Sequence, residues 1–153
     1  MDNTDRQSAL VGSVALAADH AGFHLKEHLK AVLQGFELRV TDLGTDSPDS
    51  TDYPAYGHAV AREIAEGRVD CGVLVCGTGI GMSIAANRHK GVRAAVCHSP
   101  EEASYSRSNN DANILCLGGR IISTTAAEGI LTTFLTTRFE GGRHERRVRQ
   151  LEL

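Results

Sequence analysis

The sequence predicts an α/β fold, a three-layer α/β/α, Rossmann-like domain built on a five-stranded parallel sheet. Five short runs rich in Val, Ala and Leu alternate with longer segments of helical periodicity, which is typical of βαβ units. These runs are apolar on both faces, as strands covered by helices on both sides require. The chain of 153 residues has the length of one domain and shows no internal repeat, low-complexity tract or linker.

The expected elements follow from these patterns. Leu25, Leu29, Val32 and Leu33 are spaced i, i+4, i+7 and i+8, so they share one helical face after the first strand. The expected strands are residues 11–18, 37–43, 72–76, 92–97 and 113–118; the other expected helices are residues 56–65, 82–88, 100–108 and 124–139, followed by a C-terminal helical arm. We expect strand order 2-1-3-4-5 and one domain over residues 1–153, of which residues 1–12 form a flexible N-terminal extension.

Charge and composition exclude several classes of protein. The chain has 16 Lys and Arg, 19 Asp and Glu, a net charge of −3 and 41% hydrophobic residues. These values exclude a disordered chain, a collagen and a polybasic nucleic-acid binder. Residues 1–13 are polar, unlike a signal peptide, and no run approaches the roughly 18 apolar residues that span a membrane. We therefore expect a cytoplasmic protein without nucleic-acid or membrane partners.

The four cysteines, Cys71, Cys76, Cys97 and Cys116, do not have the C-x-x-C spacing of metal or redox sites. No other cluster has metal-ligand spacing either, so we expect no metal and no cofactor. Cys71, Cys97 and Cys116 lie in apolar runs and are expected to be small buried hydrophobic residues. Cys76 differs, because it ends the third strand and begins a glycine-rich loop.

In a sheet of this class, ligands bind beyond the carboxyl ends of the strands, near the switch between strands 1 and 3. The residues at these two ends are ADHAG (residues 18–22) and CGTGIG (residues 76–81). Two structural alternatives stay open. Asp19 could cap the following helix, and the glycine loop could merely let strand and helix pack closely around a buried, inert Cys76.

The glycine-rich loop is not a nucleotide-binding signature. The G-x-G-x-x-G fingerprint would need a glycine at Met82, and the Lys-Ser/Thr ending of a P-loop is absent. Such a loop still exposes N–H groups to anions, and the dipole of the following helix favours a thiolate at Cys76. This arrangement suits a base or a nucleophile. A nucleophilic cysteine normally needs a histidine nearby, for which His20, His98 and His144 are candidates.

Five motifs follow one another in order: DHAG (residues 19–22), TDYP (51–54), CGTGIG (76–81), IAAN (84–87) and GGRH (141–144). Together they resemble the motifs of the type B ribose-5-phosphate isomerases, a family that also contains galactose-6-phosphate and allose-6-phosphate isomerases. The resemblance extends from about residue 14 to residue 149. It implies metal-free aldose–ketose isomerisation of a phosphorylated sugar through a cis-enediol. It also implies a homodimer or tetramer whose sites use both subunits.

The resemblance also implies residue roles. Cys76 would be the base that moves a proton between C1 and C2, with its thiolate hydrogen-bonded by Thr78. The backbone N–H groups of Gly77, Thr78, Gly79, Ile80 and Gly81 would stabilise the enediolate oxygens. The residues expected to contact the sugar hydroxyls are Asp19, His20, Tyr53 and Asn110. Those expected to bind the phosphate are His20, Arg120, Arg143 and Arg147, the last two from the partner subunit.

One position departs from the family pattern. Asn109 stands where many members have a histidine thought to open the furanose ring, and asparagine cannot exchange a proton near neutral pH. His98 could substitute for that histidine, or the pair of Asp19 and His20 could suffice. Alternatively, the substrate forms no ring, as with a four-carbon aldose phosphate. Ribose 5-phosphate is the expected substrate; allose or galactose 6-phosphate, a four-carbon aldose phosphate, or a non-catalytic sensor of a sugar phosphate or nucleotide are alternatives.

Overall fold

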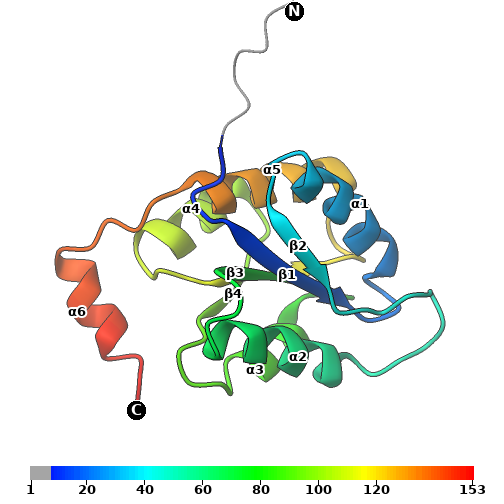
Figure 1. Cartoon of the computed structure of the whole chain (residues 1–153), viewed down its shortest axis with the longest axis horizontal. Helices are drawn as coiled ribbons and strands as arrows, with labels where there is room; N and C mark the ends of the chain where they lie inside the picture. Colours follow the sequence, from blue (N-terminus) through cyan, green and yellow to red (C-terminus); the bar gives the residue numbers. More distant parts are fainter. Residues whose placement is uncertain (1–7) are drawn as a thin grey trace, which may run out of the picture.

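The computed structural model describes residues 8–153 and confirms the three-layer α/β/α, Rossmann-like fold (Figure 1). All strands of its sheet are parallel. The strands are β1 (Ser13–Ala18), β2 (Arg39–Asp42), β3 (Cys71–Cys76), β4 (Ala94–Val96) and β5 (Ile114–Gly118). The helices are α1 (Phe23–Gln34), α2 (Tyr53–Ala65), α3 (Ile80–Ala86), α4 (Pro100–Ser108), α5 (Thr124–Thr136) and α6 (Arg143–Arg149). Within residues 8–153, no helix has the length and apolar character needed to cross a membrane.

The strand order is β2-β1-β3-β5-β4, so the expected order 2-1-3-4-5 was wrong for the last two strands. All five residues of β5 are buried, whereas β4 has three residues that are all partly exposed. A fully apolar strand needs cover on both faces and therefore takes the interior position, while a short strand tolerates the sheet edge. The switch point between β1 and β3 is unaffected, because these two strands remain neighbours.

The core lies in two layers, one on each face of the sheet. Alternate residues of β1 point to opposite faces, as the pleat requires. On one face Leu16 packs with residues of α1, α4 and α5, such as Leu29 and Ile130. On the other face Ala17 packs with residues of α2 and α3, such as Val60 and Met82. Figure 1 shows these two groups of helices above and below the strands.

Three cysteines belong to this core, as expected. Cys71, Cys97 and Cys116 are each no more than 4% exposed. Burial raises the pKa of the Cys71 thiol to about 12 and that of Cys97 to about 11, and it raises the pKa of Cys116 as well. These three thiols are therefore neutral near pH 7 and act as small apolar side chains.

Several element boundaries differ from the expected ones, by up to three residues. α2 begins at Tyr53 rather than at residue 56, since Pro54 fits the first turn of a helix. α5 ends at Thr136 rather than at residue 139. Of the N-terminal extension expected over residues 1–12, residues 1–7 lie outside the described residues. Within the rest, the N–H of Leu10 donates to the carbonyl oxygen of Leu135 at 2.9 Å.

A buried lysine links α1 to β2. Lys26 is fully buried, and its Nζ donates to both carboxylate oxygens of Asp42 at 2.9 and 2.7 Å. Burial alone would raise the pKa of Asp42, but hydrogen bonds from Lys26 and Lys30 outweigh it and keep that pKa below its ordinary value of 3.8. Asp42 also accepts the N–H of Gly44 at 2.9 Å, so the ion pair anchors the loop that follows β2.

The first prediction concerns this ion pair. We expect Lys26→Met to lower the free energy of unfolding by about 3 kcal/mol, because Asp42 loses its buried partner. Chemical denaturation at pH 7 measures the loss. Since the folded pKa of Asp42 is lowered, its contribution is present above its unfolded pKa and disappears as the pH falls through the folded value. The difference between variant and wild type should therefore shrink in acid; a loss below about 1 kcal/mol at pH 7 would contradict the account.

Candidate functional site

The carboxyl ends of β1, β3 and β5 meet at one edge of the sheet. In the register of the strands Ala18 is paired with Val75, and Cys76 with Gly118. A pocket of about 440 Å³ lies at this edge. Nine of the predicted site residues line it: Asp19, His20, Tyr53, Cys76, Gly77, Thr78, Ile80, Gly81 and Arg120.

Cys76 lies at the base of this pocket and is 4% exposed. Its Sγ accepts a hydrogen bond from the N–H of Gly79 at 3.1 Å. An N–H group aimed at sulfur stabilises negative charge there. The N–H of Gly79 is thus a donor to Sγ besides the expected Thr78. The Oγ1 of Thr78 accepts the N–H of Ile80 at 3.2 Å, which leaves its hydroxyl proton available to donate.

Two glycines give the loop its shape. Gly79 has a φ of +82°, a left-handed conformation that glycine adopts without strain, and this turn brings its N–H onto Cys76. Gly81 allows a close approach, because a Cβ at this position would lie 2.6 Å from ring atoms of Tyr53. The Tyr53 ring therefore packs directly on the loop. The Tyr53 side chain, at the start of α2, and Gly81 together form one wall of the pocket.

Asp19 and His20 form the β1 side of the pocket. The Oδ1 of Asp19 accepts the N–H groups of Ala21 and Gly22 at 3.0 and 3.1 Å. Both residues precede α1, whose N-cap residue is Gly22 and which has no side-chain cap hydrogen bond, so Asp19 shapes the turn before the helix and does not cap it. Both bonds use Oδ1, which leaves Oδ2 for a ligand. The Nδ1 of His20 lies 3.1 Å from the backbone nitrogen of Thr51 and 3.2 Å from its carbonyl oxygen. This leaves the ring's Nε2 for a ligand.

Arg120 supplies positive charge to the β5 side of the pocket. Its backbone N–H donates to the carbonyl oxygen of Gly77 at 3.0 Å. Its guanidinium lies against the glycine loop, since a Cβ on Gly77 would be 3.3 Å from Nη1. A guanidinium beside exposed backbone N–H groups suits an anionic ligand such as a phosphate. Ala21 and Ile84 also line the pocket and were not predicted; both lie inside quoted motifs, next to residues that were.

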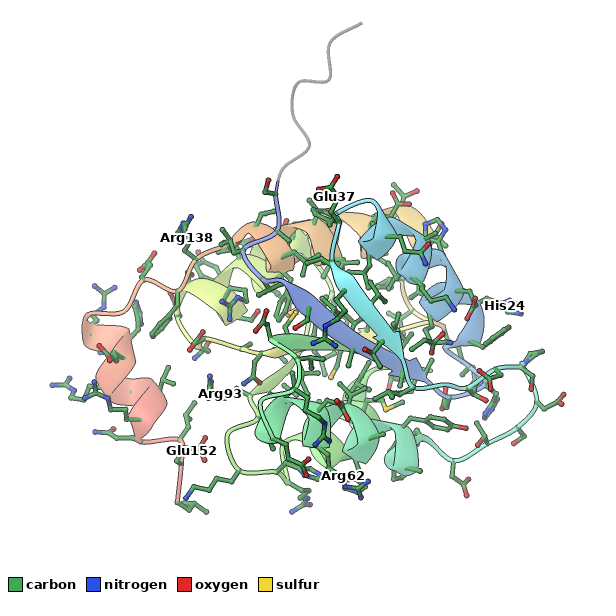
Figure 2. All side chains as sticks on the ribbon, in the orientation of Figure 1. His24, Glu37, Arg62, Arg93, Arg138 and Glu152 are labelled. Atoms are coloured by element: carbon green, nitrogen blue, oxygen red, sulfur yellow. The ribbon has the colours of Figure 1, made fainter. Side chains whose placement is uncertain are left out.

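The remaining candidates lie outside this pocket. His98 follows β4, with its side chain 49% exposed and its Nδ1 3.5 Å from Glu102. Asn109 and Asn110 follow α4 and precede β5, so they lie toward the amino ends of the strands. In Figure 2 the two ends of the sheet lie on opposite sides: His24, in the first turn of α1, lies on the right, and Arg93, directly before β4, lies to the left of it.

The arm that carries Arg143 and Arg147 also lies away from the pocket. In Figure 1 the arrows of β1 and β2 point to the right, and α6 lies at the far left. His144 is 7% exposed, and its Nε2 has no hydrogen-bond partner among residues 8–153. The Oε2 of Glu140 is 3.6 Å away. Within residues 8–153, no three His, Cys, Asp or Glu residues are placed to hold a metal ion.

Comparison with known proteins decides the family. Residues 14–151 match the family model described as Ribose/Galactose Isomerase. The chain belongs to the ribose/galactose isomerase family. This confirms the family expected from the five motifs. Ribose-5-phosphate isomerase B of Escherichia coli is 46% identical to the chain over 135 residues, which cover 88% of this chain and 91% of the relative.

Solved structures of family members share the fold. The ribose 5-phosphate isomerase of Thermotoga maritima is 51% identical, with a TM-score of 0.90 over 92% of this chain and 97% of the other. Ribose-5-phosphate isomerase B of Mycoplasma genitalium, solved with bound ribulose 5-phosphate, is 38% identical, with a TM-score of 0.88. It covers 91% of this chain and 93% of its own.

Proposed function

We propose that the protein interconverts the aldose and ketose forms of a phosphorylated sugar, with ribose 5-phosphate and ribulose 5-phosphate as the substrate pair. The observation that carries the proposal is the hydrogen bond from Gly79 to Cys76 at the base of a pocket that also contains Asp19 and Arg120. The relatives named as ribose-5-phosphate isomerase B support it. Because a charged phosphate ester does not cross membranes unaided, we place the reaction in the cytoplasm.

Cys76 acts as the base in this proposal. Its thiolate removes the proton from C2 of the open-chain aldose while O1 gains a proton, which gives a cis-enediol. The thiol then returns its proton to C1 while O2 loses one, which gives the ketose. Negative charge develops on O1 and O2 during both steps. In this proposal the N–H groups of Gly77, Thr78 and Gly81 stabilise that charge, since those of Gly79 and Ile80 already donate to Cys76 and to the Oγ1 of Thr78. Each well-placed donor contributes about 3 kcal/mol.

Asp19 and His20 interact with the oxygen atoms of the substrate. Asp19 and Cys76 each follow one residue of the pair Ala18 and Val75, so they lie beside each other at the carboxyl edge of the sheet. The free Oδ2 of Asp19 can relay the proton that O2 loses and O1 gains, accepting it from O2 and donating it to O1, so that the oxygens balance over the reaction. His20 and Tyr53 contact further hydroxyls, and His20 joins Arg120 at the phosphate.

A second copy of the chain completes the site. Arg143 and Arg147 lie on α6, away from the pocket of their own chain, and arginine binds phosphate through two parallel hydrogen bonds. Three side chains at the rim of the pocket are exposed: Tyr53 to 40%, Ile80 to 54% and Ile84 to 53% of their surface. They form apolar surface that a second copy would cover. We propose a homodimer, alone or as half of a tetramer, in which the partner supplies both arginines and Asn110.

An assay with a panel of sugar phosphates tests the function. Purified protein is incubated with ribose 5-phosphate, ribulose 5-phosphate, and aldose phosphates of four and six carbons. We expect the five-carbon pair to have the highest kcat/KM. Tight binding of one compound without interconversion of any would instead indicate a sugar-phosphate sensor. Such a sensor would not need Cys76, Asp19 and the arm arginines in combination.

The second prediction concerns Asn109, where the chain lacks the family's ring-opening histidine. Ribose 5-phosphate is mostly a closed furanose, so an added proton donor should help. We expect Asn109→His to raise kcat/KM for ribose 5-phosphate by about tenfold or more. A four-carbon aldose phosphate cannot close this ring, so its kcat/KM should not change. Both values come from steady-state kinetics. Efficient turnover of ribose 5-phosphate by the wild type, with no gain in the variant, would assign ring opening to His98 or to the pair of Asp19 and His20.

A further inference from the structure

A peptide group of the loop before α2 holds the His20 ring. Nδ1 of His20 lies within hydrogen-bond distance of both the backbone nitrogen and the carbonyl oxygen of Thr51, at 3.1 and 3.2 Å. In one tautomer Nδ1 accepts from the N–H of Thr51, and in the other its own N–H donates to the carbonyl oxygen. Thr51, 31 residues away in the sequence, can therefore hold the ring in either tautomer.

Thr51 is held in turn by Tyr56. The Oγ1 of Thr51 and the Oη of Tyr56 are 3.2 Å apart. Hydrogen bonds with Thr45 and Thr51 keep the pKa of the Tyr56 hydroxyl below its ordinary value of 10.0. The ring packs on the backbone of Gly44, where a Cβ would lie 3.1 Å from Cε1. Tyr56 thus contacts both ends of the loop formed by residues 43–52.

Both supports of this loop are attached to the buried core. At its start the N–H of Ala18 donates to the carbonyl oxygen of Gly44 at 2.7 Å, and the N–H of Thr45 donates to that of Ala18 at 2.8 Å. At its end Tyr56 belongs to α2, whose residues Val60 and Ala61 are fully buried. The Tyr56 hydroxyl therefore connects a fixed helix to the peptide that orients His20.

We propose that Tyr56 is a positioning residue, which orients His20 for the substrate through Thr51. Tyr56 is not among the residues that line the pocket, so it acts without touching the substrate. The role of His20 rests on the proposed function, but its orientation does not. Loss of the Tyr56 hydroxyl frees the Thr51 side chain and lets the His20 ring turn.

Tyr56→Phe tests this third prediction, since it removes the hydroxyl and keeps the ring on Gly44. We expect KM for ribose 5-phosphate to rise about tenfold and kcat to stay within about twofold, because His20 contributes to binding. Tyr105→Phe is the matched control, because Tyr105 is 56% exposed on α4, outside the pocket. It should change neither value. Thr51→Val, which removes Oγ1 and keeps the peptide, should reproduce the effect of Tyr56→Phe.

A double-mutant cycle separates positioning from general stability. In a His20→Ala background, Tyr56→Phe should cause no further rise in KM, because the ring that it orients is gone. Additive effects would overturn the proposal, as would an unchanged KM in Tyr56→Phe alone.

Nitrogen-15 NMR of the His20 imidazole supplies a measurement independent of turnover. In the ligand-free protein, Tyr56→Phe should shift the Nδ1 signal of His20, and Tyr105→Phe should not. If the signal moves while the wild type isomerises no sugar phosphate, the positioning role stands and the proposed function fails. An unmoved Nδ1 signal would overturn the positioning role whatever the activity.

Discussion

Cys76→Ala is expected to abolish isomerisation and to leave binding of the substrate phosphate nearly intact. The variant loses the sulfur that receives the carbon-bound proton, whereas Arg120 and the arm arginines remain. A positioned acid–base group accelerates a proton-transfer step by about 10²- to 10⁴-fold, so kcat should fall by about 10³-fold or more. Steady-state kinetics measures kcat, and isothermal titration with the sugar phosphate measures binding. Turnover within about tenfold of the wild type, a change of about 1.4 kcal/mol in the barrier, would identify another base.

Two control variants sharpen this fourth prediction. Cys76→Ser keeps an atom that can accept the N–H of Gly79. A hydroxyl ionises far less readily than a thiol and supplies almost no anionic base near pH 7, so this variant should be nearly as inactive as Cys76→Ala. Cys97→Ala removes a different thiol, which is 1% exposed and outside the pocket. It should keep the kcat of the wild type, which would show that the loss at residue 76 does not come from removing any buried cysteine.

Mixed dimers of Cys76→Ala and Arg143→Ala chains are expected to regain activity that neither parent has. If Arg143 acts in the partner's pocket, each heterodimer contains one site with an intact Cys76 and an intact Arg143. The other site carries both changes. A verified heterodimer, purified through two different tags, should therefore show about half the kcat of the wild-type dimer, measured per dimer with ribose 5-phosphate.

The same experiment identifies the contrary arrangement. If Arg143 served the pocket of its own chain, every site of the heterodimer would carry one defect, and no activity would return. Arg149→Ala is the matched control on α6, because Arg149 is exposed and paired with Glu145 at 2.6 Å. It should keep the activity of the wild type both alone and in heterodimers.

The pocket was predictable from the sequence because its residues follow two strands that could be recognised individually. Runs such as residues 13–18 and 71–76 are apolar on both faces, and parallel strands bring their carboxyl ends to one edge. The signal for the correct strand order was also present. ILCLG (residues 114–118) is a stronger candidate for an interior strand than AAV (residues 94–96). Apolar content therefore predicts the strand order better than position along the chain does.

Other features could not be predicted from sequence patterns. The contact between His20 and Thr51 depends on the path of residues 43–52, which have neither helical nor strand periodicity. Asp19 bonds the turn before α1 through Oδ1 and still lines the pocket, because a carboxylate has two oxygens; the sequence alone does not show which oxygen serves which contact. In the proposed dimer, the positions of Asn110, Arg143 and Arg147 relative to a substrate depend on a second copy of the chain, which local propensity does not describe.

Isomerisation in D₂O followed by proton NMR tests the central claim most directly. A cysteine base that exchanges its proton with solvent places deuterium on carbon, at C1 of the ribulose 5-phosphate formed from ribose 5-phosphate. We predict that the wild type accumulates this label during prolonged incubation and that Cys76→Ala accumulates none. Interconversion of the two sugars by the wild type without any deuterium on carbon, or equal labelling by Cys76→Ala, would contradict proton transfer by Cys76.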